Sequence, residues 1–88
     1  MPVISRFYGI LITMLFKERG HNTPHFHAKY GEDTAVYSIA PFKKMEGKLK
    51  SRAEKMVKEW AMAHQKELLE NWERASQHKP LKDIEPLD

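Results

Sequence analysis

Hydrophobic residues in the first half of the chain follow the spacing of β-strands. Residues 3–16 place apolar side chains on both alternating faces and contain Gly9 at a bend, so we expect one or two strands there. Residues 26–30 and 35–39 predict further strands, with turns at 20–24 and 31–33. Residues 43–49 fit either a loose hairpin arm or a loop.

The second half of the chain has the apolar spacing of a helix. Ser51 and Glu54 fit a capping box, and apolar residues recur at helical intervals from Ala53 onwards. We expect one helix to about Ser76, with a kink near His64 as the alternative. The apolar residues after Pro80 are expected to hold the tail against the domain; they are Leu81, Ile84 and Leu87.

These patterns predict an α+β fold, with a small antiparallel sheet of three to four strands followed by one long C-terminal helix. The 88 residues are expected to form a single domain, β-rich over 1–49, helical over 50–76 and ending in a tail over 77–88. The apolar run 7–16 is too short to span a bilayer as a helix, which takes about 20 residues. We expect no membrane contact and a cytoplasmic location.

Composition limits the chemistry of a site. The chain has no cysteine, so a metal would need His, Asp or Glu ligands. The net charge is +3, but six cations lie close together at Lys43, Lys44, Lys48, Lys50, Arg52 and Lys55. Such a cluster attracts nucleic acid or an acidic partner protein, or is simply a solvated surface.

The segment HNTPHFHAKY, residues 21–30, carries the main candidate chemistry. Side chains alternate along a strand, so His25, His27 and Lys29 share one face and the apolar residues between them share the other. Two imidazoles at this spacing suit a metal, a phosphate, or general acid and base catalysis. The alternative is structural, with one histidine bonded to a carbonyl and the other solvated.

Polar residues interrupt the apolar stripe of the expected helix. His64, Glu67 and Asn71 lie near its centre, and unpaired burial costs roughly 1–3 kcal/mol for each such group, so we expect them to be at least half buried and hydrogen-bonded. His64 and Glu67 also have the spacing of a shared metal site. Trp60 and Trp72 are expected to be core or interface anchors.

The segments NTPHFHAKYGE and HQKELLENW together resemble a small bacterial family, the domain of unknown function 4160. That family is marked by a Pro-Pro-His-x-His turn and a late His-x-x-Glu-Leu-Leu-x-x-Trp helix. The motifs fall on Pro24, His25, His27, His64, Glu67, Leu68, Leu69 and Trp72, whereas Thr23 replaces the first proline. The resemblance implies a toxin–antitoxin component, because genes of the family commonly neighbour a second small family.

Our first hypothesis is therefore a toxin-like half of a two-protein module, with a cognate small partner protein and RNA as target. Cleavage or binding of RNA would use His25, His27 and Lys29, and further binding residues would be His64, Glu67, Asn71 and Trp72. The alternatives are a non-catalytic interaction module and a metal-binding protein using His25 and His27, with or without His64 or Glu67 as a further ligand. We expect no cofactor and no strong metal site. The strand over residues 10–16 is apolar on both faces and one helix covers one face, so we also expect a homo-oligomer.

Overall fold

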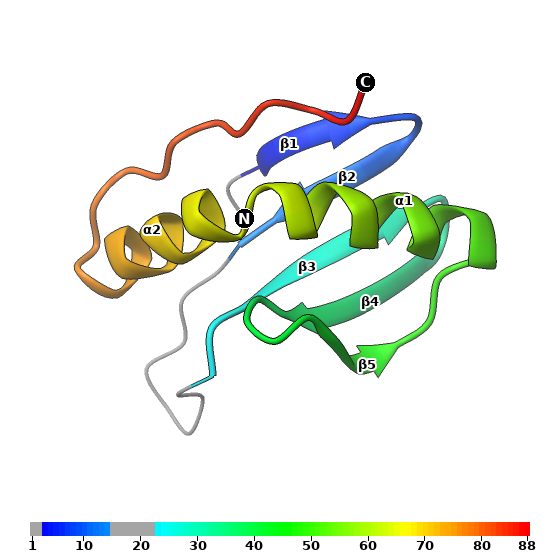
Figure 1. Ribbon diagram of the computed structural model, residues 1–88, viewed down its shortest axis with the longest axis horizontal. Coiled ribbons are helices and arrows are strands. Elements are labelled where there is room, and N and C mark those ends of the chain that lie inside the picture. Colours follow the sequence, from blue (N-terminus) through cyan, green and yellow to red (C-terminus); the bar gives the residue numbers. More distant parts are fainter. Residues whose placement is uncertain (1–2, 15–22) are drawn as a thin grey trace.

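A computed structural model describes residues 3–14 and 23–88 of the chain. Five strands form one antiparallel sheet in the order β1-β2-β3-β4-β5, and two helices follow. The strands are β1 (Val3–Phe7), β2 (Ile10–Thr13), β3 (His25–Tyr30), β4 (Asp33–Ser38) and β5 (Lys43–Gly47), and the helices are α1 (Ser51–Ala63) and α2 (Gln65–Ser76). Figure 1 shows both helices on the same face of the sheet.

The α+β class is confirmed, but the sheet has five strands instead of three to four. Residues 3–13 form two strands because Tyr8 and Gly9 both adopt positive φ angles, of 49° and 80°. Two such residues in succession make the tight turn that matches the twist of a hairpin. The segment 43–49, for which a hairpin arm or a loop was expected, supplies β5.

The prediction of one long helix is wrong, because the helical segment divides at His64. This residue has a φ of −123°, and its N–H donates to the carbonyls of both Trp60 and Ala61. The expected interruption near His64 is therefore a break between two helices. The capping box is also wrong, since Lys50 occupies the N-cap position and no side chain caps α1.

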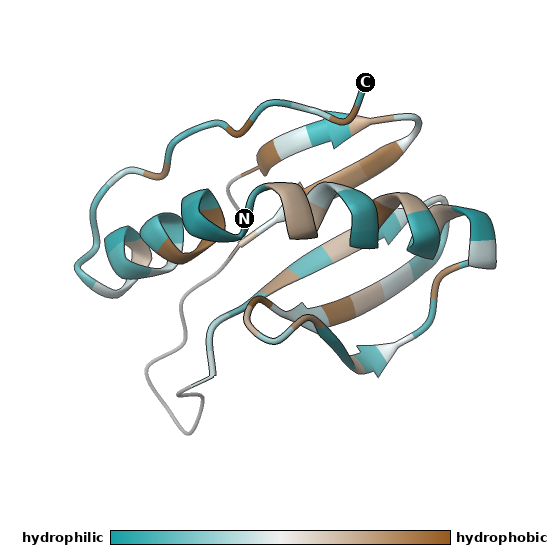
Figure 2. Ribbon diagram, in the orientation of Figure 1, coloured by the Kyte–Doolittle hydropathy of each residue, from teal (hydrophilic) through white to brown (hydrophobic). Residues whose placement is uncertain are grey.

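The apolar face of β3 packs on the helices, as the alternation predicted. Phe26 and Ala28 are buried, and the Phe26 ring meets the Trp60 ring edge-on with centroids 5.9 Å apart. Ile10, Ile12 and Met14 belong to the same core. Figure 2 shows the resulting contrast between the largely hydrophobic β2 and the more hydrophilic helices.

No described helix covers the opposite face of the sheet. On β2 and β4 it presents Leu11 and Val36, both half-buried, while Leu15 and Phe16 lie outside the described residues. Leu11 pairs with Lys29 of β3, so this face mixes apolar and charged side chains. Self-association through it stays a prediction.

The C-terminal tail packs against β1, as its apolar residues suggested. The Ile84 side chain is buried, and its N–H donates to the Ile4 carbonyl over 2.8 Å. Leu81 and Leu87 also pack against the core. The tail thus lies along the outer edge of β1 (Figure 1).

We predict that Gly47→Ala destabilises the fold by about 2–4 kcal/mol. Gly47 has a φ of +72°, and an added Cβ would lie 2.2 Å from the carbonyl oxygen of Thr34 on β4. The matched control is Gly31→Ala, which has a similar φ of +63° but meets no atom within 4 Å, so its cost should be about 1 kcal/mol. Urea denaturation measures both, and equal losses would contradict the close approach of β5 to β4.

Candidate functional site

His25 and His27 lie together at the start of β3, but their exposure differs. Their ring centroids are 5.7 Å apart. His25 is only 5% exposed, and its Nδ1 lies 2.9 Å from the Thr23 carbonyl oxygen, to which the protonated nitrogen donates. His27 is half-buried. The pair therefore consists of one enclosed imidazole and one that reaches the surface.

Trp72 of α2 explains the burial of His25. The two rings lie 4.9 Å apart between centroids and are tilted by 53°. This contact joins the beginning of β3 to a helix more than forty positions later in the chain. Of the residues predicted to bind a ligand, Trp72 is thus brought together with His25.

The strand register places His27 and Lys29 on the sheet face that carries no described helix. His27 is flanked by Thr13 on β2 and Val36 on β4. Lys29 is exposed and pairs with Leu11, which in turn pairs with Arg6 on β1. We call this surface the helix-free face, and its central residues are Arg6, Leu11, His27, Lys29 and Val36.

His64 and Glu67 form a second pair at the junction of the helices. The His64 Nδ1 and a Glu67 carboxylate oxygen are 2.5 Å apart, and the His64 ring also packs on Trp60 at 5.7 Å. The His64 side chain is 19% exposed and that of Glu67 is 47% exposed. This pair braces the turn between α1 and α2, with Glu67 at the border of the solvent.

Asn71 completes the polar row and is fully buried. Its Nδ2 donates to the Lys82 carbonyl over 2.8 Å, and its Oδ1 accepts from the Lys82 N–H over 2.9 Å. The Asn71 side-chain amide thus pairs with both backbone groups of Lys82, as a neighbouring strand would. All three residues of the row are hydrogen-bonded, as predicted, although Glu67 only just meets the expected burial.

Sequence reasoning missed a polar contact between the sheet and α1. The Tyr37 hydroxyl donates to the Glu54 carboxylate over 2.9 Å, and Lys44 lies 3.7 Å from the same oxygen. Burial of the ring, followed by the hydrogen bond to Glu54 and its negative charge, raises the pKa of Tyr37 well above its usual range. Glu54 was assigned to the capping box, and nothing in its local sequence indicates a partner 17 positions earlier.

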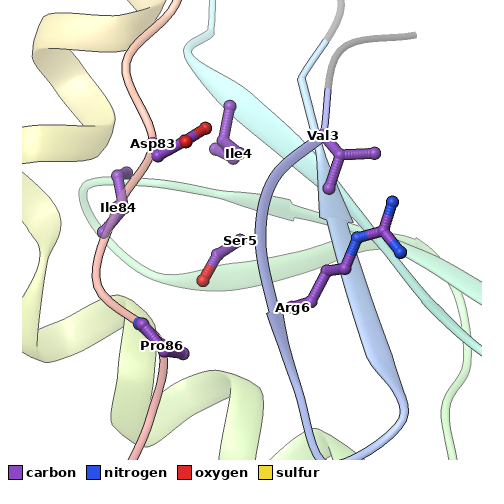
Figure 3. Close-up of a pocket in the computed structure, with 7 residues that line it drawn as sticks. All are labelled: Val3, Ile4, Ser5, Arg6, Asp83, Ile84 and Pro86. Atoms are coloured by element: carbon purple, nitrogen blue, oxygen red, sulfur yellow. The ribbon is translucent and has the colours of Figure 1, made fainter.

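A shallow pocket lies between β1 and the tail. It is lined by Val3, Ile4, Ser5, Arg6, Asp83, Ile84 and Pro86. Figure 3 shows Ile4 and Ser5 between β1 and the tail, whereas Val3 and Arg6 project away from it. The Ser5 hydroxyl is buried, and no hydrogen-bond partner for it is found in the described part of the chain.

The described residues contain no group of three or more His, Asp or Glu side chains arranged for a metal ion. His64 and Glu67 contact each other, while His25 and His27 lie on β3. His21 lies outside the described residues. A metal site that uses both pairs is therefore not supported by the geometry.

The fold and the site together define a small α+β protein in which two helices cover one face of a five-stranded antiparallel sheet. A family model described as "Domain of unknown function (DUF4160)" matches residues 9–73, and the chain belongs to this family. The resemblance noted from the sequence is thereby confirmed. No curated protein and no solved structure matches the chain. Among the described residues, no helix is long and apolar enough to cross a membrane.

We predict that Asn71→Ala destabilises the protein by about 2–3 kcal/mol, because the Lys82 N–H and carbonyl lose their partner. Amide hydrogen exchange should also accelerate along the tail. The control is Ser5→Ala, which removes a buried hydroxyl that has no described partner and should change stability by less than about 0.5 kcal/mol. If Asn71→Ala left the free energy of unfolding unchanged, the tail would be held by other contacts.

The raised pKa of Tyr37 predicts a loss of stability in alkali. Below about pH 10 the tyrosine is protonated in both states, so it contributes no pH dependence. Above that pH the unfolded state releases the proton first, and the free energy of unfolding falls by up to about 1.4 kcal/mol per pH unit. Tyr37→Phe should lack this part of the decline, which denaturation curves at about pH 9 and about pH 11 measure. Parallel declines in the two proteins would rule out the contribution of Tyr37.

Proposed function

We propose that this protein is the toxin-like half of a two-protein bacterial module and that it binds RNA through the helix-free face. The observation that carries the proposal is the sheet surface itself, because the register places the exposed cations Arg6 and Lys29 and the imidazole of His27 on the same face. No described helix covers these side chains. Open sheet surfaces suit RNA because the strands present several side chains to splayed-out nucleotides.

The side chains of this face divide the binding chemistry between them. Arg6 and Lys29 supply positive charge for phosphate groups, and each neutralised phosphate releases counterions. The His27 ring supplies a planar surface on which a base stacks. Leu11 lies between Arg6 and Lys29 in the register and provides apolar contact area.

The geometry favours binding over cleavage by a histidine pair. General acid and base catalysis requires both groups to reach the reacting atoms. His25 is enclosed by Trp72 and occupied at Nδ1 by the Thr23 carbonyl. We therefore assign His25 a positioning role and His27 the contact with RNA.

The second candidate function is a non-catalytic interaction module, which the same burial of His25 favours. In that case the helix-free face would bind the cognate partner protein or a second copy of this chain, using Leu11 and Val36. The two candidates place the ligand on the same surface but differ in its chemical class. A cofactor is not required by either.

We expect induced expression of this protein alone to arrest growth of a bacterial host, and co-expression of the neighbouring gene to relieve the arrest. Because His27 and Lys29 would contact the target, His27→Ala with Lys29→Ala should abolish the arrest. The matched control is Lys66→Ala, which removes an exposed cation from α2. Circular dichroism establishes that each variant is folded.

RNA binding is measured directly by fluorescence anisotropy with a single-stranded RNA. The double variant should bind at least about tenfold more weakly, and the affinity of the wild type should fall steeply with salt. Growth arrest without RNA binding would favour the interaction module. The absence of both arrest and RNA binding in the wild type would overturn the proposed function.

A further inference from the structure

The two edges of the sheet differ in whether another described segment of the chain lies against them. At β1 the tail lies alongside the outer edge, with the Ile84 N–H bonded to Ile4 and the Glu85 carbonyl accepting from the Trp60 indole. At the other edge, β5 pairs with β4, and no described segment pairs with its outer side. β5 therefore remains an open edge strand among the described residues (Figure 1).

The open edge is strongly basic. All five residues of β5 are exposed, and Figure 2 shows it as largely hydrophilic. Six exposed cations gather on β5, on the connection to α1 and on the first turns of α1. We call this surface the basic edge, and its cations are Lys43, Lys44, Lys48, Lys50, Arg52 and Lys55.

Within residues 43–55 the cations outnumber the acidic residues. Two carboxylates, Glu46 and Glu54, fall within the same stretch of sequence. Glu54 is already engaged by the Tyr37 hydroxyl and by Lys44. The remaining cations therefore produce a positive potential beside an exposed strand backbone.

We propose that the basic edge binds an extended acidic segment of a partner protein by β-strand addition. An open edge offers backbone N–H and carbonyl groups that an added strand can pair with, and flanking side chains then choose its sequence. Here the flanking side chains are cationic, so they select a segment rich in Asp and Glu. This surface is separate from the RNA-binding residues Arg6, His27 and Lys29, and the proposal stands without them.

The charge of the edge argues against the other occupants. Two copies of β5 side by side would bring like charges together, which disfavours a homodimer through this edge. RNA satisfies the cations but has no peptide backbone to extend the sheet. An acidic strand satisfies both features at once.

The edge is held ready for such a strand. Gly47 lets β5 approach β4 closely, and the Lys48 N–H donates to the Thr34 carbonyl over 3.1 Å just beyond the strand. The Lys44 side chain is drawn toward Glu54, which links β5 to α1. A preformed edge reduces the ordering cost that binding must overcome.

The test uses a synthetic peptide of about eight residues that alternates Glu with Val or Thr, the length and composition of a short strand. Added to the full-length protein, it should shift the amide NMR signals of residues 43–48 and slow their hydrogen exchange. The same peptide with Lys in place of Glu should bind at least about tenfold more weakly. An N-methylated version of the acidic peptide should lose a similar factor, because it cannot pair along its backbone.

Charge-reversal variants locate the binding surface. Lys43→Glu with Lys48→Glu should weaken the acidic peptide by at least about tenfold. The matched control is Lys66→Glu with Lys79→Glu, which changes the net charge equally on exposed residues away from β5 and should bind as the wild type does. The NMR map of the wild type needs no variant and keeps the test valid if a variant fails to fold.

Each contrary result has a defined meaning. Equal binding of the N-methylated peptide would show charge attraction without strand addition and would overturn the proposal. Binding of single-stranded RNA at residues 43–48 without binding of the acidic peptide would make the edge a nucleic-acid surface. Peptide-induced shifts confined to residues outside 43–48 would equally overturn it.

Discussion

Trp60 is the contact on which the arrangement of the whole domain depends. Its buried ring packs against the rings of Phe7 on β1 and Phe26 on β3. The distances between ring centroids are 5.4 Å and 5.9 Å. The ring also contacts His64 at the end of α1, and its indole N–H donates to the Glu85 carbonyl in the tail. One side chain thus fixes the helix on the sheet and the tail on the helix, and its single polar group is satisfied.

The helix α2, which follows the break at His64, makes a second set of contacts with the sheet and the tail. On α2, Trp72 contacts His25 at the start of β3, and Asn71 binds the tail at Lys82. Leu68, between these positions, is part of the core. His25 and Trp72 therefore connect β3 to α2, and His64 and Glu67 contact each other at the turn between the helices.

The parts of this fold that were predictable follow from local periodicity. Alternation placed Phe26 and Ala28 in the core and His27 and Lys29 on the opposite face, and the apolar tail residues were correctly expected to pack on the domain. The number of strands was not predictable in the same way. β5 is exposed at all five residues, so it lacks the alternation that marks a half-buried strand.

The contacts of the candidate site that local patterns do not indicate are those whose partners lie far away in the sequence. The burial of His25 depends on Trp72, and the role of Glu54 depends on Tyr37. Because the partners are far apart in the sequence, no local pattern indicates either contact. Ser51 and Glu54 fit the capping pattern, but no side chain caps α1. The Glu54 carboxylate accepts a hydrogen bond from the Tyr37 hydroxyl of the sheet instead.

The two proposed surfaces follow from how little protein is available to cover the sheet. Two short helices and a tail cover one face and the β1 edge, so the opposite face and the β5 edge remain open among the described residues. Each open surface has a different feature that disfavours nonspecific association with other chains. The helix-free face mixes half-buried apolar residues with cations, whereas the basic edge relies on repulsion between lysines. A surface protected by charge alone stays accessible to a ligand of opposite charge, and this is the physical basis of the acidic strand proposed for the β5 edge.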